Sequence, residues 1–179
     1  TSQEPLGRAR TALELLLSRT GNDVDALGKL GEIFRAAGDT KIAEGCFERV
    51  LAESPTDVRA LAFLSQEAES RSDFRRAASL KERLARELPS GPDRFQLLLA
   101  SGDLWLRAKG QVAAALRAYE EALNDDPRNM ELLTTLLGLY VDQESWERAA
   151  PALRAIADLE TDPARKAKTL ADLANVLEG

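Results

Sequence analysis

The stretch LGKLGEIFRAAGDTKIAEGCFERVLAESP, residues 27–55, contains the pattern that decides the fold. Its first part places Leu27, Leu30 and Phe34 three and four positions apart, which is the spacing of one face of an α-helix. The Gly38-Asp39 pair then interrupts the pattern, because glycine and aspartate are suited to turns and helix caps. A second apolar stripe with helical spacing follows, and a proline ends it. The stretch therefore predicts two helices joined by a short turn.

The second of these stripes recurs along the chain. Each copy begins with a small residue and continues four, seven and eight positions later, on the same helix face. Pro55 and Pro89, which close two of the copies, lie 34 residues apart. The copies are Ala9, Leu13, Leu16 and Leu17; Ala43, Phe47, Val50 and Leu51; Ala77, Lys81, Leu84 and Ala85; Ala115, Tyr119, Ala122 and Leu123; and Ala149, Leu153, Ile156 and Ala157. This recurrence indicates that one helical unit is repeated.

The first stripe recurs as well. Its copies are Leu27, Leu30, Gly31 and Phe34; Leu61, Leu64, Ser65 and Ala68; Leu133, Leu136, Leu137 and Tyr140; and Ala167, Leu170, Ala171 and Ala174. The third unit is longer than the others, and two registers fit its first helix. One register uses Leu98, Ser101-Gly102 and Trp105, and the alternative uses Leu99 and Leu106. Both registers give a helical stripe, so both stay open at this point.

This pattern resembles the tetratricopeptide repeat (TPR), a helix-turn-helix unit of 34 residues. The resemblance is carried by Leu30-Gly31, Phe34, Ala43, Phe47 and Pro55, and again by Tyr119, Ala122 and Pro127. It implies an all-α fold, an α-solenoid in which about ten helices stack as antiparallel pairs in a right-handed superhelix. In the fold of that family, the first helix of each pair lines a concave groove.

We expect residues 1–179 to form a single TPR array. Its units are a half repeat of the second-helix type at 5–23, full repeats at 24–57, 58–91, 92–129 and 130–163, and a half repeat of the first-helix type at 164–179. The sequence begins at Thr1 without an initiator methionine. Together with the half repeats at both ends, this predicts a fragment of a longer TPR-containing protein.

The composition limits the chemistry that we expect. The chain has no histidine and a single cysteine, Cys46, so Ser-His-Asp or Cys-His catalysis, imidazole metal ligands and an internal disulfide are excluded. No phosphate loop or Gly-x-Ser-x-Gly motif occurs. We therefore predict that the protein is not an enzyme and has no catalytic, metal-binding or cofactor-binding residues.

The charge and hydropathy patterns limit the partners. A net charge of −6 argues against nucleic acid, and no apolar run approaches the roughly 18 residues that span a bilayer. One basic cluster is interpreted as a solvated outer face rather than an RNA site. It comprises Arg71, Arg75, Arg76, Lys81, Arg83 and Arg86. The single cysteine suits a reducing compartment such as the cytoplasm and is also compatible with the periplasm, so the compartment stays open.

The helical register assigns side chains to the predicted groove. The candidates for contact with a partner are Glu32, Arg35, Arg59, Gln66, Leu99, Asp103, Leu106, Arg107, Thr134 and Val141; the register also places Gln96 and Glu131 there. Leu99 and Leu106 would supply apolar contacts, and the arginines would pair with acidic groups. We predict a non-catalytic interaction module that binds a peptide or protein segment in this groove and acts as an assembly scaffold.

Two other functions stay open. Apolar residues gather at both ends of the array, where terminal repeats usually have a polar outer face. These residues are Leu6, Leu13, Leu15, Leu16 and Leu17 at one end, and Leu170, Leu173, Val176 and Leu177 at the other. The first alternative is therefore a structural spacer or a scaffold that self-associates through its ends. The second, more distant alternative is an accessory domain of a larger enzyme.

Overall fold

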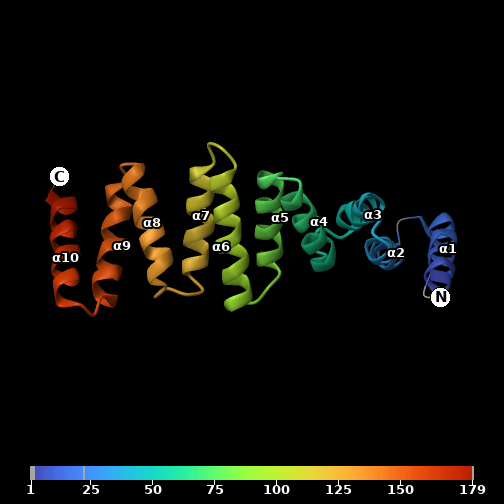
Figure 1. Ribbon diagram of the computed structural model, residues 1–179, viewed down its shortest axis with the longest axis horizontal. Helices are drawn as coiled ribbons and strands as arrows, with labels where there is room; N and C mark the ends of the chain where they lie inside the picture. Colours follow the sequence, from blue (N-terminus) through green and yellow to red (C-terminus); the bar gives the residue numbers. More distant parts are fainter. Residues whose placement is uncertain (1–2, 22, 179) are drawn as a thin grey trace. The chain divides into compact units, whose positions relative to one another are not determined.

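The computed structural model describes residues 3–21 and 23–178 (Figure 1). Over these residues the fold is all-α: ten helices follow one another along the chain, and this part contains no strand. The predicted fold class is therefore confirmed. The hand of the superhelix concerns the arrangement of the whole chain and stays a prediction.

The packing divides the chain into two compact units, Thr1–Glu87 and Leu88–Gly179, each of which is described by itself. We call them unit 1 and unit 2. The organisation of all helices as one continuous array stays a prediction.

Polar residues placed just before the helices set where several of them begin. The side chains of Asp23, Asp57 and Asn129 each accept a hydrogen bond from the backbone N–H three residues later, at 2.9, 3.0 and 3.0 Å. Each bond satisfies one of the donors that the first turn of a helix leaves without a partner. One helix of unit 2 begins instead at Pro92, because proline lacks the N–H that would be unpaired there.

Unit 1 contains five helices. They are α1 (Gln3–Thr20), α2 (Val24–Ala36), α3 (Thr40–Glu53), α4 (Val58–Ser70) and α5 (Phe74–Arg86). Phe47 of α3 is fully buried, and its ring lies 4.7 Å from the ring of Phe63 on α4, measured between centroids. Gly31 of α2 makes room for it, since a Cβ at position 31 would lie 3.0 Å from the ring of Phe47. The Leu-Gly pair read in the sequence is thus the place where α2 and α3 meet.

Unit 2 contains the other five helices. They are α6 (Pro92–Arg107), α7 (Val112–Leu123), α8 (Met130–Asp142), α9 (Trp146–Leu159) and α10 (Pro163–Glu178). Arg94, near the start of α6, joins this helix to the end of α7. Its Nη1 lies 2.9 Å from both carboxylate oxygens of Asp125, and its Nη2 lies 2.5 Å from Oε1 of Glu121. The side chain of Asp125 is only 1% exposed, so this ion pair is largely shielded from water.

The packing of α6 on α7 decides between the two registers proposed for the first helix of the repeat at residues 92–129. Leu98 and Ser101 are fully buried, and Gly102 is buried against the ring of Tyr119. A Cβ at position 102 would overlap that ring. Leu106, by contrast, is 39% exposed. The first register is therefore the one in the structure.

Candidate functional site

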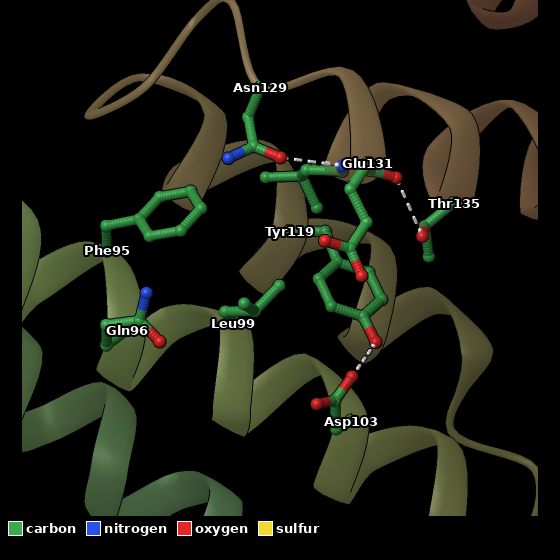
Figure 2. Close-up of a pocket in the computed structure, with 9 residues that line it drawn as sticks. Phe95, Gln96, Leu99, Asp103, Tyr119, Asn129, Glu131 and Thr135 are labelled. Carbon is green, nitrogen blue, oxygen red and sulfur yellow. Dashed lines mark hydrogen bonds between the residues drawn. The ribbon is translucent and has the colours of Figure 1, made fainter.

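A pocket in unit 2 lies where α6, α7 and α8 come together (Figure 2). Most of its lining comes from α6 and α8, which are the first helices of two successive helix pairs. Its volume is about 220 Å³. Its lining residues are Phe95, Gln96, Leu99, Asp103, Tyr119, Asn129, Glu131, Leu132 and Thr135. We call it the α6–α8 pocket.

Apolar side chains form one part of the α6–α8 pocket. Phe95 and Leu132 are 7% and 1% exposed, so they belong to the core and present only a small surface to the pocket. Leu99 is half-buried, one turn after Phe95 on α6. Leu99 is therefore the apolar side chain with the most surface left for a ligand.

Tyr119 combines a core position with a polar group at the pocket. Its ring is 1% exposed, and its hydroxyl donates a hydrogen bond of 2.5 Å to Oδ1 of Asp103, drawn in Figure 2. Burial first, and the hydrogen bond and charge of Asp103 in addition, raise the pKa of Tyr119 well above its ordinary value. The phenol therefore stays neutral at physiological pH and holds the carboxylate of Asp103 at the edge of the pocket.

The remaining polar residues differ in how they are engaged. Asn129 caps α8 through Oδ1, and its Nδ2 donates to Asp126 at 2.9 Å. Thr135 donates through Oγ1 to the backbone oxygen of Glu131 at 3.0 Å. Gln96 and Glu131 are exposed, and Figure 2 shows the Glu131 side chain extending between the two helices. The side chains of Asn129 and Thr135 thus form hydrogen bonds with the backbone of α8, while the Glu131 carboxylate projects into the space between α6 and α8.

The structure brings only some of the predicted groove residues of unit 2 to this pocket. Leu99 and Asp103 line it. Leu106 and Arg107, at the end of α6, are exposed and lie outside it, as do Thr134 and Val141 of α8. Leu106 lies seven residues after Leu99 and Val141 seven after Thr134, and that spacing puts each pair on one helix face. A row of side chains therefore runs along α6 from Leu99 in the pocket to Leu106, and Thr134 and Val141 form a row on α8 that does not line the pocket.

The predicted groove residues of unit 1 are largely paired with each other or with neighbours. Glu32 and Arg35 form an ion pair of 2.6 Å within α2. Arg59 of α4 forms an ion pair of 3.0 Å with Asp57, and its guanidinium lies against Gly28 of α2.

Gln66 is exposed on α4. A pocket in unit 1 has a different lining, with Gly7, Arg10, Phe34 and residues at the end of α2. A single groove through both units stays a prediction.

The ion pair at Arg59 has a consequence for the titration of Asp57. Burial alone would raise the pKa of Asp57, but the hydrogen bonds from the Arg59 side chain and from the N–H of Ala60, with the charge of Arg59, lower it below its ordinary value. The charged form of this helix cap is thus favoured in the folded protein.

Sequence reasoning missed several residues of the α6–α8 pocket. Tyr119 was assigned only to packing, although the same residue also presents its hydroxyl to Asp103. Phe95, Asn129, Leu132 and Thr135 lie beside the predicted groove positions on the same helices. Their role depends on how α6 and α8 are placed, which helical spacing alone does not specify. A wider helix face around Leu99 would have included Phe95.

The basic cluster at the end of α4 and on α5 is matched by acidic partners in unit 1. Arg71 lies 2.6 Å from Glu44, and Arg76 lies 2.7 Å from Glu48. Lys81 lies 3.2 Å from Glu69. The Arg83 side chain donates instead to the backbone oxygen of Pro55, and Arg86 pairs with Glu82 on its own helix. The pairs of Arg71, Arg76 and Lys81 thus link neighbouring helices of unit 1.

The acidic side chains and the single cysteine bear on metal binding and on nucleophilic chemistry. Across the described residues, no group of three or more Cys, Asp or Glu side chains has the arrangement of a metal site. Cys46 is buried, and burial, which outweighs the effect of Arg49, raises the pKa of its thiol. Within the same part of the chain, none of the helices combines the length and the apolar character needed to cross a membrane.

The apolar residues expected at the ends of the array are partly exposed. Leu15 and Leu16 of α1 are 55% and 40% exposed, and Leu170 of α10 is 45% exposed. Leu173 is buried. The side chains of Leu6, Val176 and Leu177 lie outside the residues whose side chains are described.

The helices form antiparallel pairs, and the α6–α8 pocket lies between the first helices of two successive pairs. This arrangement defines a helical-repeat protein, a class that uses its stacked helices as a binding surface. The sequence profile of the Tetratricopeptide repeat family matches residues 29–92 and 106–165. These segments make up more than half of the chain, which therefore belongs to the tetratricopeptide repeat family. It is a protein-interaction or scaffold module in the general sense of that family.

Solved structures with a similar fold include several of MamA. MamA 41-end from Desulfovibrio magneticus RS-1 is 18% identical, with a TM-score of 0.50 over 88% of this chain and 87% of that chain. A crystal form of MamA AMB-1 is 21% identical, with a TM-score of 0.55 over 88% and 84%. A double mutant of MamA RS-1 is 19% identical, with a TM-score of 0.52 over 88% of both chains. At these identities the similarity concerns the fold. No curated protein matches the sequence.

Proposed function

We propose that the chain is a non-catalytic adaptor that binds a protein segment on the α6–α8 face of unit 2. The observation that carries this proposal is the α6–α8 pocket, in which a half-buried leucine lies between exposed polar groups. Ligand sites in proteins commonly combine apolar surface with a few placed polar groups in this way. The row from Leu99 to Leu106 extends this surface along α6 beyond the pocket, and an extended segment requires a surface of that kind.

The exposed apolar side chains on this face would gain most from a partner. Leu106 and Val141 are 39% and 42% exposed. Removing such side chains from water is favourable by about 25 cal/mol for each Å² of apolar surface. A segment lying along α6 and α8 would cover both, together with Leu99. An adaptor that holds such a segment in place acts as an assembly scaffold.

The proposal that the adaptor is non-catalytic is supported by the available side chains. The chain has no histidine, and its one cysteine is buried with a raised thiol pKa. A thiol of this kind is mostly protonated at neutral pH and is a poor nucleophile. The titratable groups at the α6–α8 pocket are two carboxylates and a tyrosine, and the tyrosine is held neutral.

The binding site is tested with short random peptides displayed on phage and selected against the full chain. The affinity of selected, synthesised peptides is measured by isothermal titration calorimetry for the wild-type protein, for Leu99→Ser and for Leu106→Ser. Each substitution is expected to weaken binding roughly tenfold, the equivalent of one buried leucine contact. Circular dichroism is expected to show unchanged helix content.

Leu170→Ser is the matched control, because Leu170 is 45% exposed in the same unit but lies on α10, away from the pocket. It is expected to leave peptide affinity unchanged. Failure to select any peptide, or equal affinities for the wild-type protein and for Leu106→Ser, would refute the proposed site.

A second candidate function is self-association through the ends. It is favoured by the exposure of Leu15 and Leu16 on α1 and of Leu170 on α10. Sedimentation equilibrium distinguishes this function: a dimer that Leu15→Ser or Leu170→Ser dissociates would support it. A monomer at high protein concentration would refute it.

A further inference from the structure

The α6–α8 pocket has an uneven distribution of charge. Its lining includes two carboxylates, Asp103 from α6 and Glu131 from α8, and it includes no lysine or arginine. Arg94, which precedes Phe95 on α6, is paired with Asp125 and Glu121, and Arg107 at the end of α6 does not line the pocket. The lining of the pocket therefore carries acidic side chains and no basic one.

The lining of the pocket supplies no cation to neutralise either carboxylate. By contrast, Glu44, Glu48 and Glu69 of α3 and α4 each lie within ion-pair distance of an arginine or lysine. Asp103 accepts a hydrogen bond from Tyr119, which fixes its position and leaves its charge in place. Figure 2 shows Glu131 reaching from the opposite helix toward the same space. The two side chains flank the opening from opposite sides.

The rest of the pocket is apolar at the places that a long side chain would touch. Leu99 of α6 lies in the lining (Figure 2), and Phe95 and Leu132, which are 7% and 1% exposed, add buried apolar surface to it. Lysine and arginine have an aliphatic stem that packs on apolar surface and a charged end that stays with polar groups. Gln96, exposed at the rim, carries a donor and an acceptor suited to the backbone of a bound segment.

Other side chains fit this arrangement less well. An acidic side chain would meet two carboxylates of the same sign. A purely apolar side chain would cover Leu99 but would displace water from Glu131 without replacing its hydrogen bonds, which costs free energy. A cationic side chain satisfies both parts of the pocket at once.

We propose that the α6–α8 pocket takes the side chain of a lysine or arginine of the bound protein segment. The aliphatic stem lies on Leu99, and the cationic group lies between Asp103 and Glu131. This inference rests on the proposed function, since it names the residue type that the α6–α8 face selects in its partner. The pocket thereby sets the register of the segment along α6 and α8.

The test uses the peptides selected on the full chain. We expect each tight-binding peptide to contain a lysine or arginine whose replacement by norleucine, which keeps the stem and removes the charge, weakens binding roughly tenfold. Raising the salt concentration should weaken the lysine peptide more than the norleucine peptide, because the carboxylates are exposed to solvent.

Glu131→Gln is the decisive variant. It preserves the shape of the side chain and removes one charge from the pocket, so the difference in affinity between the lysine and norleucine peptides should shrink several-fold. Asp103→Asn should have the same effect, because the asparagine oxygen can still accept the hydrogen bond from Tyr119. Glu147→Gln is the matched control: Glu147 is exposed on α9 of the same unit, and its loss should leave the difference unchanged.

The outcomes separate the two proposals. Peptides that lose affinity with Leu106→Ser but contain no required lysine or arginine would overturn this inference and leave the proposed function standing. A lysine effect that Glu147→Gln reduces as much as Glu131→Gln would also overturn it, because the charge would then act only through the net charge of the protein. Peptides that are indifferent to Leu106→Ser would refute the proposed function itself.

Discussion

Replacing Gly102 by alanine tests the contact that sets the register of α6. In an ordinary helix this change is stabilising, because alanine is favoured over glycine by about 1 kcal/mol. Here the added Cβ would overlap the ring of Tyr119, well inside the roughly 3.5 Å at which carbon atoms make contact. The ring is 1% exposed and its hydroxyl is bound to Asp103, so it has little freedom to move aside.

The magnitude follows from three contributions. Overpacking a closely packed core costs about 1–3 kcal/mol. A displaced ring also loses much of the hydrogen bond to Asp103, which is worth about 1 kcal/mol. The gain in helix propensity offsets about 1 kcal/mol of this. We therefore expect Gly102→Ala to lower the free energy of unfolding by about 2 kcal/mol.

The measurement is urea denaturation followed by circular dichroism, with two matched alanine variants. Gly45 of α3 and Gly138 of α8 are helical glycines at which an added Cβ meets nothing within 4 Å. Their replacement by alanine is expected to raise stability by about 0.5–1 kcal/mol. If Gly102→Ala were as stable as these two variants, the tight packing of α6 on α7 would be wrong.

Two further substitutions test the ion pair of unit 2 and a helix cap of unit 1. Arg94→Met leaves the 1%-exposed carboxylate of Asp125 without its partner, so we expect a loss of about 3 kcal/mol in urea denaturation; a loss below about 1 kcal/mol would show that the pair is not shielded from water. Asp57→Ala should cost about 1 kcal/mol at neutral pH, because the cap of α4 is lost. The pKa of Asp57 is lowered in the folded protein, so its contribution is present above its ordinary pKa of about 4 and is lost as the pH falls through the lower folded value. The wild-type protein and Asp57→Ala should therefore converge in stability in acid, and a constant difference would contradict the assignment of the charge.

The helix pairs could be predicted from the sequence because their signals are local. Apolar residues at helical spacing and the turn at Gly38-Asp39 predict elements that the structure contains. The register of α6 could not be predicted in this way, because its leucines give an apolar stripe in either register. The choice depends on the contact between Gly102 and Tyr119, which belong to different helices.

The candidate site was predictable to a similar degree. Helical register places Leu99 and Asp103 on the face that lines the pocket. It does not identify Tyr119, whose ring belongs to the core while its hydroxyl reaches Asp103. Nor does it show that Arg59 is engaged by Asp57, since that pair depends on side-chain conformation. Positions on a helix face follow from spacing, whereas pockets and pairings follow from how helices meet.

The order of helices within unit 2 bears on which of its helices unfold locally most often. The extensive contacts there join each helix to the one before and after it, from α6 with α7 through to α9 with α10. Contacts between near neighbours in sequence favour rapid folding. α10 packs mainly on α9, so its amide hydrogens should exchange with solvent sooner than those of α7, which has helices on both sides. The α6–α8 pocket is lined by residues of α6, α7 and α8 and by none of α10, and thus lies in the part of unit 2 that fluctuations of the last helix disturb least.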